Sequence, residues 1–243
     1  MIQLSKRLMT VVQAVTPGHA VLDVGCDHAY AAIWLVRNGI SPCAVASDVR
    51  PGPLLAAEAN IKAEGLAGQI RTVLADGVPA DYREYTGQQA VTLILAGMGG
   101  RLMSSIIGRA AAEGILPEEI VSSPQRDPDV LRGCLAGHGF RITDEMILRE
   151  DGKTYTVIRS SADGQPVPEL SPAEALYGPV LLSAGNELLL EELQKKKALI
   201  MQIRRSVSRE TEKGSKRIQE LDRETAIITE AIQRLEAVHG AKS

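Results

Sequence analysis

The ten residues from Val21 to Tyr30 carry the side chains best suited to chemistry. They read Val-Leu-Asp-Val-Gly-Cys-Asp-His-Ala-Tyr, so an apolar run ends in Asp-x-Gly and is followed by an acid, a histidine and a tyrosine. An apolar helical pattern begins a few residues later, which predicts a strand that feeds a helix through a glycine turn. Such a corner offers a nucleotide cofactor a flexible backbone at Gly25 and the unpaired N–H groups of a helix start.

The residues after Gly25 distinguish between cofactors. A dinucleotide fold would place further glycines there to admit a pyrophosphate, but this chain has Asp27 and His28. A carboxylate repels a pyrophosphate, whereas it tolerates or favours a ligand that carries an ammonium and a sulfonium. The corner therefore indicates S-adenosylmethionine rather than NAD, although a single Asp-x-Gly also occurs in ordinary strand-to-helix turns.

Three further apolar runs end in acidic or glycine-rich tips. These tips are Asp48, then Asp76 with Gly77, and then residues 96–100, which read Ala-Gly-Met-Gly-Gly. Ligands of open α/β sheets bind outside the carboxyl ends of the strands, so all four tips belong at one edge. We expect Asp48 to accept the ribose hydroxyls of a nucleoside, Asp76 to accept a hydrogen bond from an adenine amine, and Gly77 to let the backbone approach the ring. The fourth tip would admit a flat aromatic acceptor, with Met98 packing on it.

Each motif alone has an ordinary explanation, such as an Asp-Gly turn or a glycine-rich helix start. In this order, however, the first corner, Ala-Asp-Gly and Ala-Gly-Met-Gly-Gly, together with the N-terminal Leu-Ser-Lys-Arg-Leu, resemble the bacterial TrmK family over nearly the whole chain. The resemblance implies an enzyme that transfers a methyl group from S-adenosylmethionine to N1 of the adenine at position 22 of tRNA. The chain departs from the family pattern at Ser123-Pro124-Gln125, where relatives tend to have Gln-Pro-Asn, and at Ala31-Ala32, where they have Leu-Pro.

The proposed reaction needs no obligatory general base. N1 of a neutral adenine has an available lone pair, so catalysis would rest on proximity, orientation and acidic groups that stabilise the developing positive charge. We predict Asp27 as the catalytic carboxylate, with His28 or Tyr30 positioning or stacking on the base. The residues predicted to bind the cofactor are Asp23, Gly25, Asp27, His28, Asp48, Asp76, Gly77, Gly97 and Met98.

A helix predicted over residues 5–15 precedes the first strand, with Ser5 as its N-cap. Arg7 falls in its first turn, where the helix dipole makes a cation mildly unfavourable. Solvation alone would explain an exposed arginine there. The unfavourable placement indicates instead that Arg7 reaches the rim of the active site or an RNA phosphate.

The remaining patterns predict an α/β fold, a Rossmann-like class I methyltransferase sheet with an antiparallel edge. Strands are expected at 20–24, 43–47, 70–75, 91–95 and 119–123, with helices at 28–38, 51–65, 102–112 and 130–138. Two β-rich runs, 140–150 and 154–160, are joined by Asp-Gly, which predicts an antiparallel pair at the end of the sheet.

A stretch rich in Ser, Gly and Pro, residues 160–168, separates a predicted methyltransferase domain, 1–162, from a C-terminal domain, 163–243. Two apolar stripes flank Gly214 in the second domain, which predicts two helices of about 25 residues each that fold as an antiparallel coiled-coil hairpin. Basic residues crowd this hairpin, so we expect it to bind the tRNA backbone, with a merely solvated face as the alternative. The predicted RNA-binding residues are Arg7, Gly99, Gly100, Lys195, Lys196, Lys197, Arg204, Arg205 and Arg209.

The composition of the chain limits which classes of protein and of partner are possible. The chain has 243 residues, 44% of them apolar, and a net charge of −3, so a nucleic-acid surface must be local. Three scattered cysteines argue against a metal site and for a reducing, cytoplasmic compartment, and no apolar stretch has the length of a membrane span. The sequence specifies neither the tRNA species nor the oligomeric state, for which a monomer is our expectation.

The rival hypothesis is a nucleotide-binding interaction protein that has a coiled-coil oligomerisation arm and no catalytic activity. Retention of S-adenosylmethionine without methyl transfer to any RNA would favour it. A dehydrogenase is a weaker alternative, because the dinucleotide glycine pattern is missing.

Overall fold

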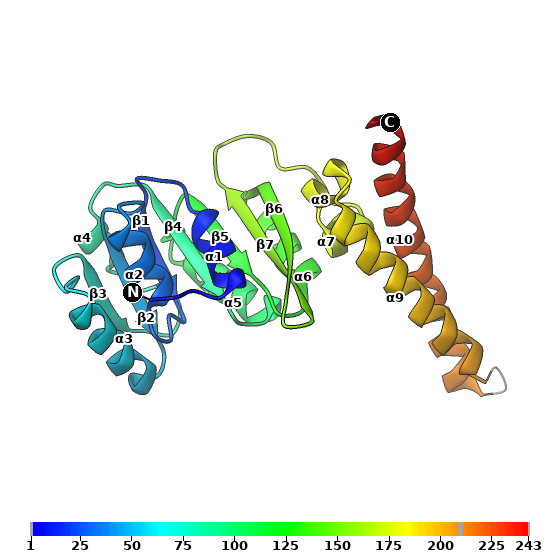
Figure 1. The fold of residues 1–243 in the computed structure, drawn as a ribbon, viewed down its shortest axis with the longest axis horizontal. Coiled ribbons are helices and arrows are strands. Elements are labelled where there is room, and N and C mark those ends of the chain that lie inside the picture. Colours follow the sequence, from blue (N-terminus) through cyan, green and yellow to red (C-terminus); the bar gives the residue numbers. More distant parts are fainter. Residues whose placement is uncertain (1, 209–210, 243) are drawn as a thin grey trace. The chain divides into compact units, whose positions relative to one another are not determined.

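The computed structural model describes residues 2–208 and 211–242. The chain divides into two compact units, Met1–Pro168 and Glu169–Ser243 (Figure 1). The first unit contains the sheet, and the second is entirely helical in its described part.

A seven-stranded sheet forms the centre of the first unit, in the order β3-β2-β1-β4-β5-β7-β6 (Figure 1). The strands are β1 (Ala20–Val24), β2 (Ala44–Asp48), β3 (Ile70–Leu74), β4 (Val91–Ala96), β5 (Glu119–Ser123), β6 (Arg141–Glu150) and β7 (Lys153–Ser161). The first five run parallel, and β7 runs antiparallel to both β5 and β6. The predicted Rossmann-like sheet with an antiparallel edge is confirmed.

Helices cover both faces of this sheet. They are α1 (Lys6–Gln13), α2 (Tyr30–Arg37), α3 (Pro51–Ala63), α4 (Tyr82–Thr86), α5 (Gly100–Ala112) and α6 (Pro128–Gly137). The first three pack into one hydrophobic cluster and the last three into another. Successive strand residues alternate between the faces, so Val21 joins the first cluster and Leu22 the second. The central strands are therefore buried on both sides, as parallel strands require.

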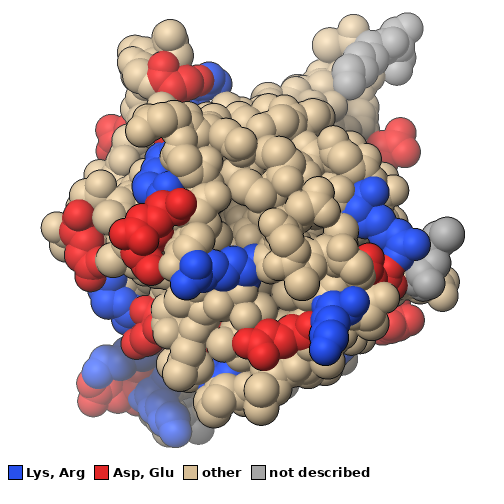
Figure 2. All heavy atoms as spheres, turned by 90° about the vertical axis from the view of Figure 1, so that its left-hand side faces the viewer, with Lys and Arg blue, Asp and Glu red and all other residues tan. Residues whose placement is uncertain are grey.

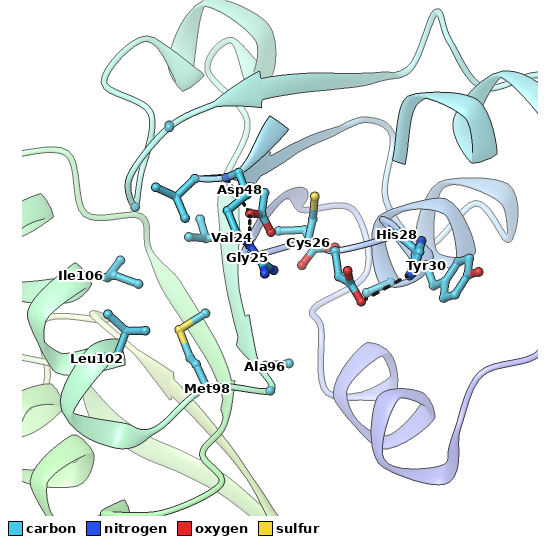
Figure 3. A pocket seen from close by; sticks show the side chains of 18 of the residues that line it. Val24, Gly25, Cys26, His28, Tyr30, Asp48, Ala96, Met98, Leu102 and Ile106 are labelled. Atoms are coloured by element: carbon cyan, nitrogen blue, oxygen red, sulfur yellow. Dashed lines mark hydrogen bonds and ion pairs between the residues drawn. The ribbon is translucent and has the colours of Figure 1, made fainter. Parts of the chain in front are cut away.

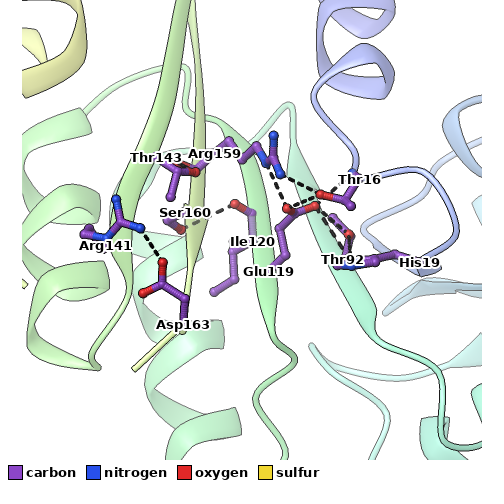
Figure 4. A network of polar contacts seen from close by, with 10 residues as sticks. All are labelled: Thr16, His19, Thr92, Glu119, Ile120, Arg141, Thr143, Arg159, Ser160 and Asp163. Carbon is purple, nitrogen blue, oxygen red and sulfur yellow. Dashed lines mark hydrogen bonds and ion pairs between the residues drawn. The ribbon is translucent and has the colours of Figure 1, made fainter. Parts of the chain in front are cut away.

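A buried polar network anchors the chain just after α1 to the starting ends of the strands (Figure 4). The Glu119 carboxylate accepts hydrogen bonds from the hydroxyls of Thr16 (2.6 Å) and Thr92 (2.7 Å) and from Nε of Arg159 (2.8 Å). Burial alone would raise the pKa of Glu119, but these donors together lower it. The network lies at the end of β5 opposite to its carboxyl tip, so it supports α1 from far outside the predicted site.

The second unit comprises α7 (Pro172–Tyr177), α8 (Pro179–Ala184), α9 (Glu187–Ser206) and α10 (Glu212–Lys242). The two long helices pack along each other through a seam of buried side chains, namely Leu189, Leu193, Ile200, Ile218, Leu221, Ile228 and Leu235. The end of α10 returns to the start of the unit, where Arg234 binds Glu174 (2.8 Å) and His239 Nε2 contacts the Gly185 carbonyl (2.6 Å). The unit is thus an antiparallel helical hairpin, but its helices have 20 and 31 residues rather than about 25 each.

Charge is finely mixed on the surface of the first unit that is seen from the side of β3. Figure 2 shows acidic and basic side chains there interspersed among neutral ones. None of the described helices is both long and apolar enough to cross a membrane.

Candidate active site

A cavity of about 550 Å³ opens at the carboxyl ends of β1 to β4 (Figure 3). It is lined by all the residues that we predicted to bind the cofactor, which are Asp23, Gly25, Asp27, His28, Asp48, Asp76, Gly77, Gly97 and Met98. Tyr30, the remaining predicted catalytic residue, lines it as well. The strand order places the four tips side by side, because neighbouring strands lie only about 4.8 Å apart.

The first corner requires a glycine for two reasons. Gly25 has a φ of +72°, and a Cβ at this position would lie 2.8 Å from Cε of Met98. Met98 belongs to the β4 tip, and its side chain points across the cavity towards Gly25 (Figure 3). The tips of β1 and β4 therefore approach so closely that a side chain on the first would displace one on the second.

Backbone strain marks the segment that follows. Asp27 and Ala29 both have positive φ angles, +50° and +56°, which residues other than glycine rarely adopt. Between them, His28 stacks on Tyr30 with ring centroids 5.3 Å apart and lies 3.7 Å from the Asp27 carboxylate. Strain of this kind gathers at functional sites, and here it turns an acid and two aromatic rings towards the cavity.

Two buried carboxylates form the inner wall. Asp48 is 5% exposed, and its Oδ1 accepts a hydrogen bond from the backbone N–H of Arg50 (2.9 Å). Asp23 is 6% exposed, and its burial, with a further contribution from the charge of Asp48, raises its pKa to about 7. A hydrogen bond from the Ala32 backbone acts in the opposite direction. A cationic ligand group would stabilise the charged form of Asp23.

The wall near β3 combines an ion pair with apolar surface. The exposed carboxylate of Asp76 pairs with Nη2 of Arg109 (2.9 Å), so part of the acceptor that we predicted for an adenine amine is already engaged. Val49 and Leu102 line the cavity while remaining 60% and 51% exposed. The sequence analysis did not identify these three residues. An apolar residue directly after Asp48, and another two positions after the glycine-rich tip, were the available signals in the sequence.

Gly99 and Gly100 lie outside the lining of the cavity. A Cβ on Gly100 would lie 2.1 Å from the Asp127 carbonyl oxygen, so this glycine lets the start of α5 pack against the loop after β5. The same loop is joined to the β4 tip by a hydrogen bond from the Gln125 N–H to the Met98 carbonyl (3.0 Å). Gln125 itself lines the cavity, although it departs from the family pattern.

Arg7 reaches the cavity from α1. Its Nη1 is buried and has no hydrogen-bond partner in the described structure. The guanidinium lies beside the β4 tip, with Nη2 3.9 Å from the position that a Cβ on Gly97 would take, and 5.6 Å from the ring centroid of Tyr155.

The other basic residues predicted to bind RNA belong to the helical hairpin, where several are paired with acids. Lys195 contacts Glu191 (2.6 Å) on the same helix, Lys196 contacts Glu224 (2.8 Å), and Arg204 binds Asp222 (3.0 Å). For Lys197 and Arg205, the described ranges contain no ion pair, and Arg209 lies outside the described residues. The sequence analysis did not identify Asp222 and Glu224 as partners of these cations, because only the folding of the hairpin brings the two acids opposite the basic residues.

Within the described parts of the chain, no three His, Cys, Asp or Glu side chains are grouped as a metal site would require.

The fold and the site together define a Rossmann-like methyltransferase rather than a dinucleotide-dependent enzyme. Three features show this: the sheet order, the acid at the end of β2 and the acid beside the glycine turn after β1.

Comparison with known proteins also indicates a methyltransferase. Residues 21–230 match the family model TrmK, described as tRNA (adenine(22)-N(1))-methyltransferase, and the chain belongs to this family. It is 30% identical over 239 residues to the tRNA (adenine(22)-N(1))-methyltransferase of Bacillus subtilis, an alignment that covers 95% of this chain and 98% of the relative.

Solved structures give the same result. The chain is similar to Sp1610 of Streptococcus pneumoniae, a putative tRNA (m1A22) methyltransferase, with 31% identity, a TM-score of 0.84, and coverage of 95% of this chain and 100% of the other. A structure of Sp1610 in complex with S-adenosyl-L-methionine matches with 30% identity and a TM-score of 0.75, and covers 97% and 99% of the two chains.

Proposed function

We propose that this chain transfers the methyl group of S-adenosylmethionine to N1 of adenine 22 in tRNA. The observation that carries the proposal is the cavity at the tips of β1 to β4, which brings the acids of three strand ends and the glycine-rich fourth tip together in a member of the TrmK family. When bound, S-adenosylmethionine supplies an electrophilic methyl group on a sulfonium.

The residues of the cavity fit this cofactor. Asp48 accepts from the ribose hydroxyls, and the Gly77 backbone and the free edge of Asp76 meet the adenine. Val49 and Leu102 provide apolar surface for a flat ring. Asp23 and Asp27 supply negative charge where a dinucleotide enzyme would bind phosphates.

Asp27, His28 and Tyr30 act on the acceptor. The Asp27 side chain is 66% exposed, so it is accessible to a nucleobase, and its charge stabilises the cationic 1-methyladenine as it forms. The stacked rings of His28 and Tyr30 provide a platform that orients the base. None of the three has to remove a proton before attack, because N1 of neutral adenine has an available lone pair.

The helical unit, which we assign residues 163–243, holds the tRNA. Lys197 and Arg205 are the best candidates for phosphate contacts among the residues that we predicted to bind RNA, because these two have no ion pair in the described structure. Lys195, Lys196 and Arg204 contribute to the positive electrostatic field of the hairpin. N1 lies on the Watson–Crick edge, so a paired adenine has to be exposed before it reaches the cavity of residues 1–162. We further propose a cytoplasmic monomer with S-adenosylmethionine as cofactor, tRNA as partner and no metal.

Methylation of unmodified bulk tRNA with a labelled donor, followed by nucleoside analysis, tests the proposal. We expect 1-methyladenine, and we expect its loss when a transcript carries guanine instead of adenine at position 22. Cofactor binding without transfer to any RNA would contradict the proposal and favour a nucleotide-binding interaction protein with a coiled-coil oligomerisation arm.

A further inference from the structure

Gln125 is the one side-chain amide among the described residues that line the cavity. It lies in the loop directly after β5 and is exposed, and the described structure contains no hydrogen bond of its side chain. An amide offers one acceptor oxygen and two N–H donors. The cavity therefore presents an unused acceptor and an unused donor, side by side, to a ligand.

The loop that carries Gln125 is fixed to the tip of β4. The backbone N–H of Gln125 donates to the Met98 carbonyl (3.0 Å), and the N–H of Gly100 donates to the Arg126 carbonyl (2.8 Å). Asp127 continues the loop with a φ of +52°, and a Cβ on Gly100 would lie 2.1 Å from its carbonyl oxygen. Gly100, which we predicted to bind RNA, thus makes room for the loop, and the Gln125 side chain starts from a fixed backbone position.

The order of the strands places Gln125 on the acceptor side of the cavity. Along the sheet from β3 through β2, β1 and β4 to β5, the first two tips carry Asp76 and Asp48, which meet the adenine and the ribose of the cofactor in the proposed function. The tip of β5 lies beyond β4, at the other end of this series. A nucleobase that enters opposite the nucleoside of the cofactor therefore arrives beside Gln125.

The reaction limits which edge of the acceptor a side chain can bind. N1 has to stay free for the methyl group, so a side chain bound to N1 on the Watson–Crick edge would block the transfer. The Hoogsteen edge, with the N6 amine as donor and N7 as acceptor, remains accessible. Glutamine is one of the two side chains that bind N6 and N7 of adenine through a pair of hydrogen bonds. Guanine presents acceptors at both positions, so the amide oxygen would face O6 without a donor.

We propose that Gln125 binds the Hoogsteen edge of the target adenine, with Oε1 accepting from the N6 amine and Nε2 donating to N7, and that Gly100 is the positioning residue for its loop. The proposal rests on the proposed function of the cavity and deepens it. As N1 forms its bond to the methyl carbon, positive charge spreads onto the N6 amine, so the hydrogen bond to Oε1 strengthens towards the transition state. Gln125 thus selects adenine and contributes to the rate of transfer.

Three tRNA transcripts test this assignment on the full chain, with kcat/KM from single-turnover rates as the measurement. They carry adenine, purine or 7-deazaadenine at position 22. Purine lacks the N6 amine and 7-deazaadenine lacks N7, while both keep the N1 lone pair. The three bases differ in the intrinsic nucleophilicity of N1, so each ratio of two transcripts in a variant is compared with the same ratio in the unaltered chain.

We expect Gln125→Ala to lower the adenine-to-purine and adenine-to-7-deazaadenine ratios by roughly 10-fold each, within the range for one hydrogen bond to a base edge. Gln125→Glu keeps an acceptor for the amine but has no donor for N7. It should therefore keep the adenine-to-purine ratio and lower the adenine-to-7-deazaadenine ratio. Gln125→Asn keeps the amide on a side chain one methylene shorter and should keep part of both ratios.

Gln13→Ala is the matched control, since Gln13 is an exposed glutamine of α1 that does not line the cavity. It should keep both ratios. A Gln125→Ala chain that keeps both ratios, or that slows equally with all three transcripts, overturns the assignment. An unaltered chain that transfers no methyl group to the adenine transcript overturns the proposed function itself, and the assignment with it.

The role of Gly100 has its own readout. Gly100→Ala should lower both ratios, because the added Cβ displaces the Asp127 carbonyl and with it the loop that carries Gln125. Calorimetry with S-adenosylmethionine separates this effect from loss of the fold, since a folded variant still binds the cofactor. A Gly100→Ala chain that binds the cofactor and keeps both ratios overturns the positioning role.

Discussion

Cε of Met98 lies 2.8 Å from the position that a Cβ on Gly25 would take. The two residues belong to the tips of β4 and β1, which pair in the sheet, so the absence of a Cβ at position 25 decides whether both tips fit. The φ of +72° at Gly25 adds a second constraint, which a smaller residue at position 98 would not relieve.

We expect Gly25→Ala to lower the free energy of unfolding by about 1 to 3 kcal/mol, because it forces both the contact with Met98 and a left-handed alanine. Urea denaturation measures the change. The double variant Gly25→Ala with Met98→Ala should recover only the part due to the contact. Full recovery would show that the backbone conformation at position 25 is unstrained.

Asp48→Ala should weaken binding of S-adenosylmethionine by about 1.5 to 3 kcal/mol, the usual cost of a lost hydrogen bond to a charged group. Calorimetry measures this, and NAD should not bind to either chain. Asp129→Ala, a change in α6 away from the cavity lining, serves as control. An unchanged affinity of Asp48→Ala would remove this carboxylate from the site.

Asp27→Ala should damage turnover more than cofactor affinity, because the exposed Asp27 carboxylate faces the acceptor side of the cavity in our proposal. The single-turnover rate at saturating cofactor is the measurement. If binding of the cofactor fell as much as the rate, Asp27 would belong to the ammonium of the cofactor rather than to catalysis.

Much of this fold follows from local sequence. The strands Ala20–Val24 and Val91–Ala96 form within one residue of where their apolar patterns predict them, because parallel strands buried on both faces leave a nearly continuous apolar signal. Every acid predicted at a strand tip lines the cavity, since the parallel order alone brings the tips together.

The remaining features depend on contacts between distant segments. Gly100 packs against Asp127, and Arg109 pairs with Asp76 across 33 positions of sequence. Arg204 finds Asp222 only when the hairpin closes. A periodic pattern carries no information on such pairs, so the sequence overstated the free positive charge of the hairpin.

The raised pKa of Asp23 predicts that the stability of the fold depends on pH. Its pKa is about 7 in the folded chain against an ordinary value of 3.8, so the folded state binds the proton more tightly than the unfolded state. The contribution of Asp23 to stability is complete below pH 4 and is lost as the pH rises through 7. Asp23→Asn lacks this loss, so relative to the unaltered chain it should gain stability between pH 4 and pH 8, on the order of a few kcal/mol.

Urea denaturation of both cofactor-free chains at a series of pH values measures this difference. All other titrating groups are shared, so they cancel in the comparison. A difference that stays constant from pH 4 to pH 8 would show that Asp23 is charged in the folded chain despite its burial.

The basic side chains of the helical unit predict an affinity for tRNA that falls as the salt concentration rises. Each phosphate contact releases counterions, so replacing a contacting cation reduces the slope of log affinity against log salt by about 1. Arg205→Ala and Lys197→Ala should each do so. Lys196→Ala is the internal comparison, because its ammonium already pairs with Glu224 (2.8 Å) and its loss should change the slope less.

Removal of residues 169–243 tests the unit as a whole. The remaining chain, Met1–Pro168, contains the complete sheet and the whole lining of the cavity, so it should fold and still bind S-adenosylmethionine. It should no longer methylate tRNA, because the phosphate contacts that hold the substrate are gone. Methylation at the full-length rate would show that the hairpin is a packing or oligomerisation arm, and the salt slopes of Arg205→Ala and Lys197→Ala would then match that of the unaltered chain.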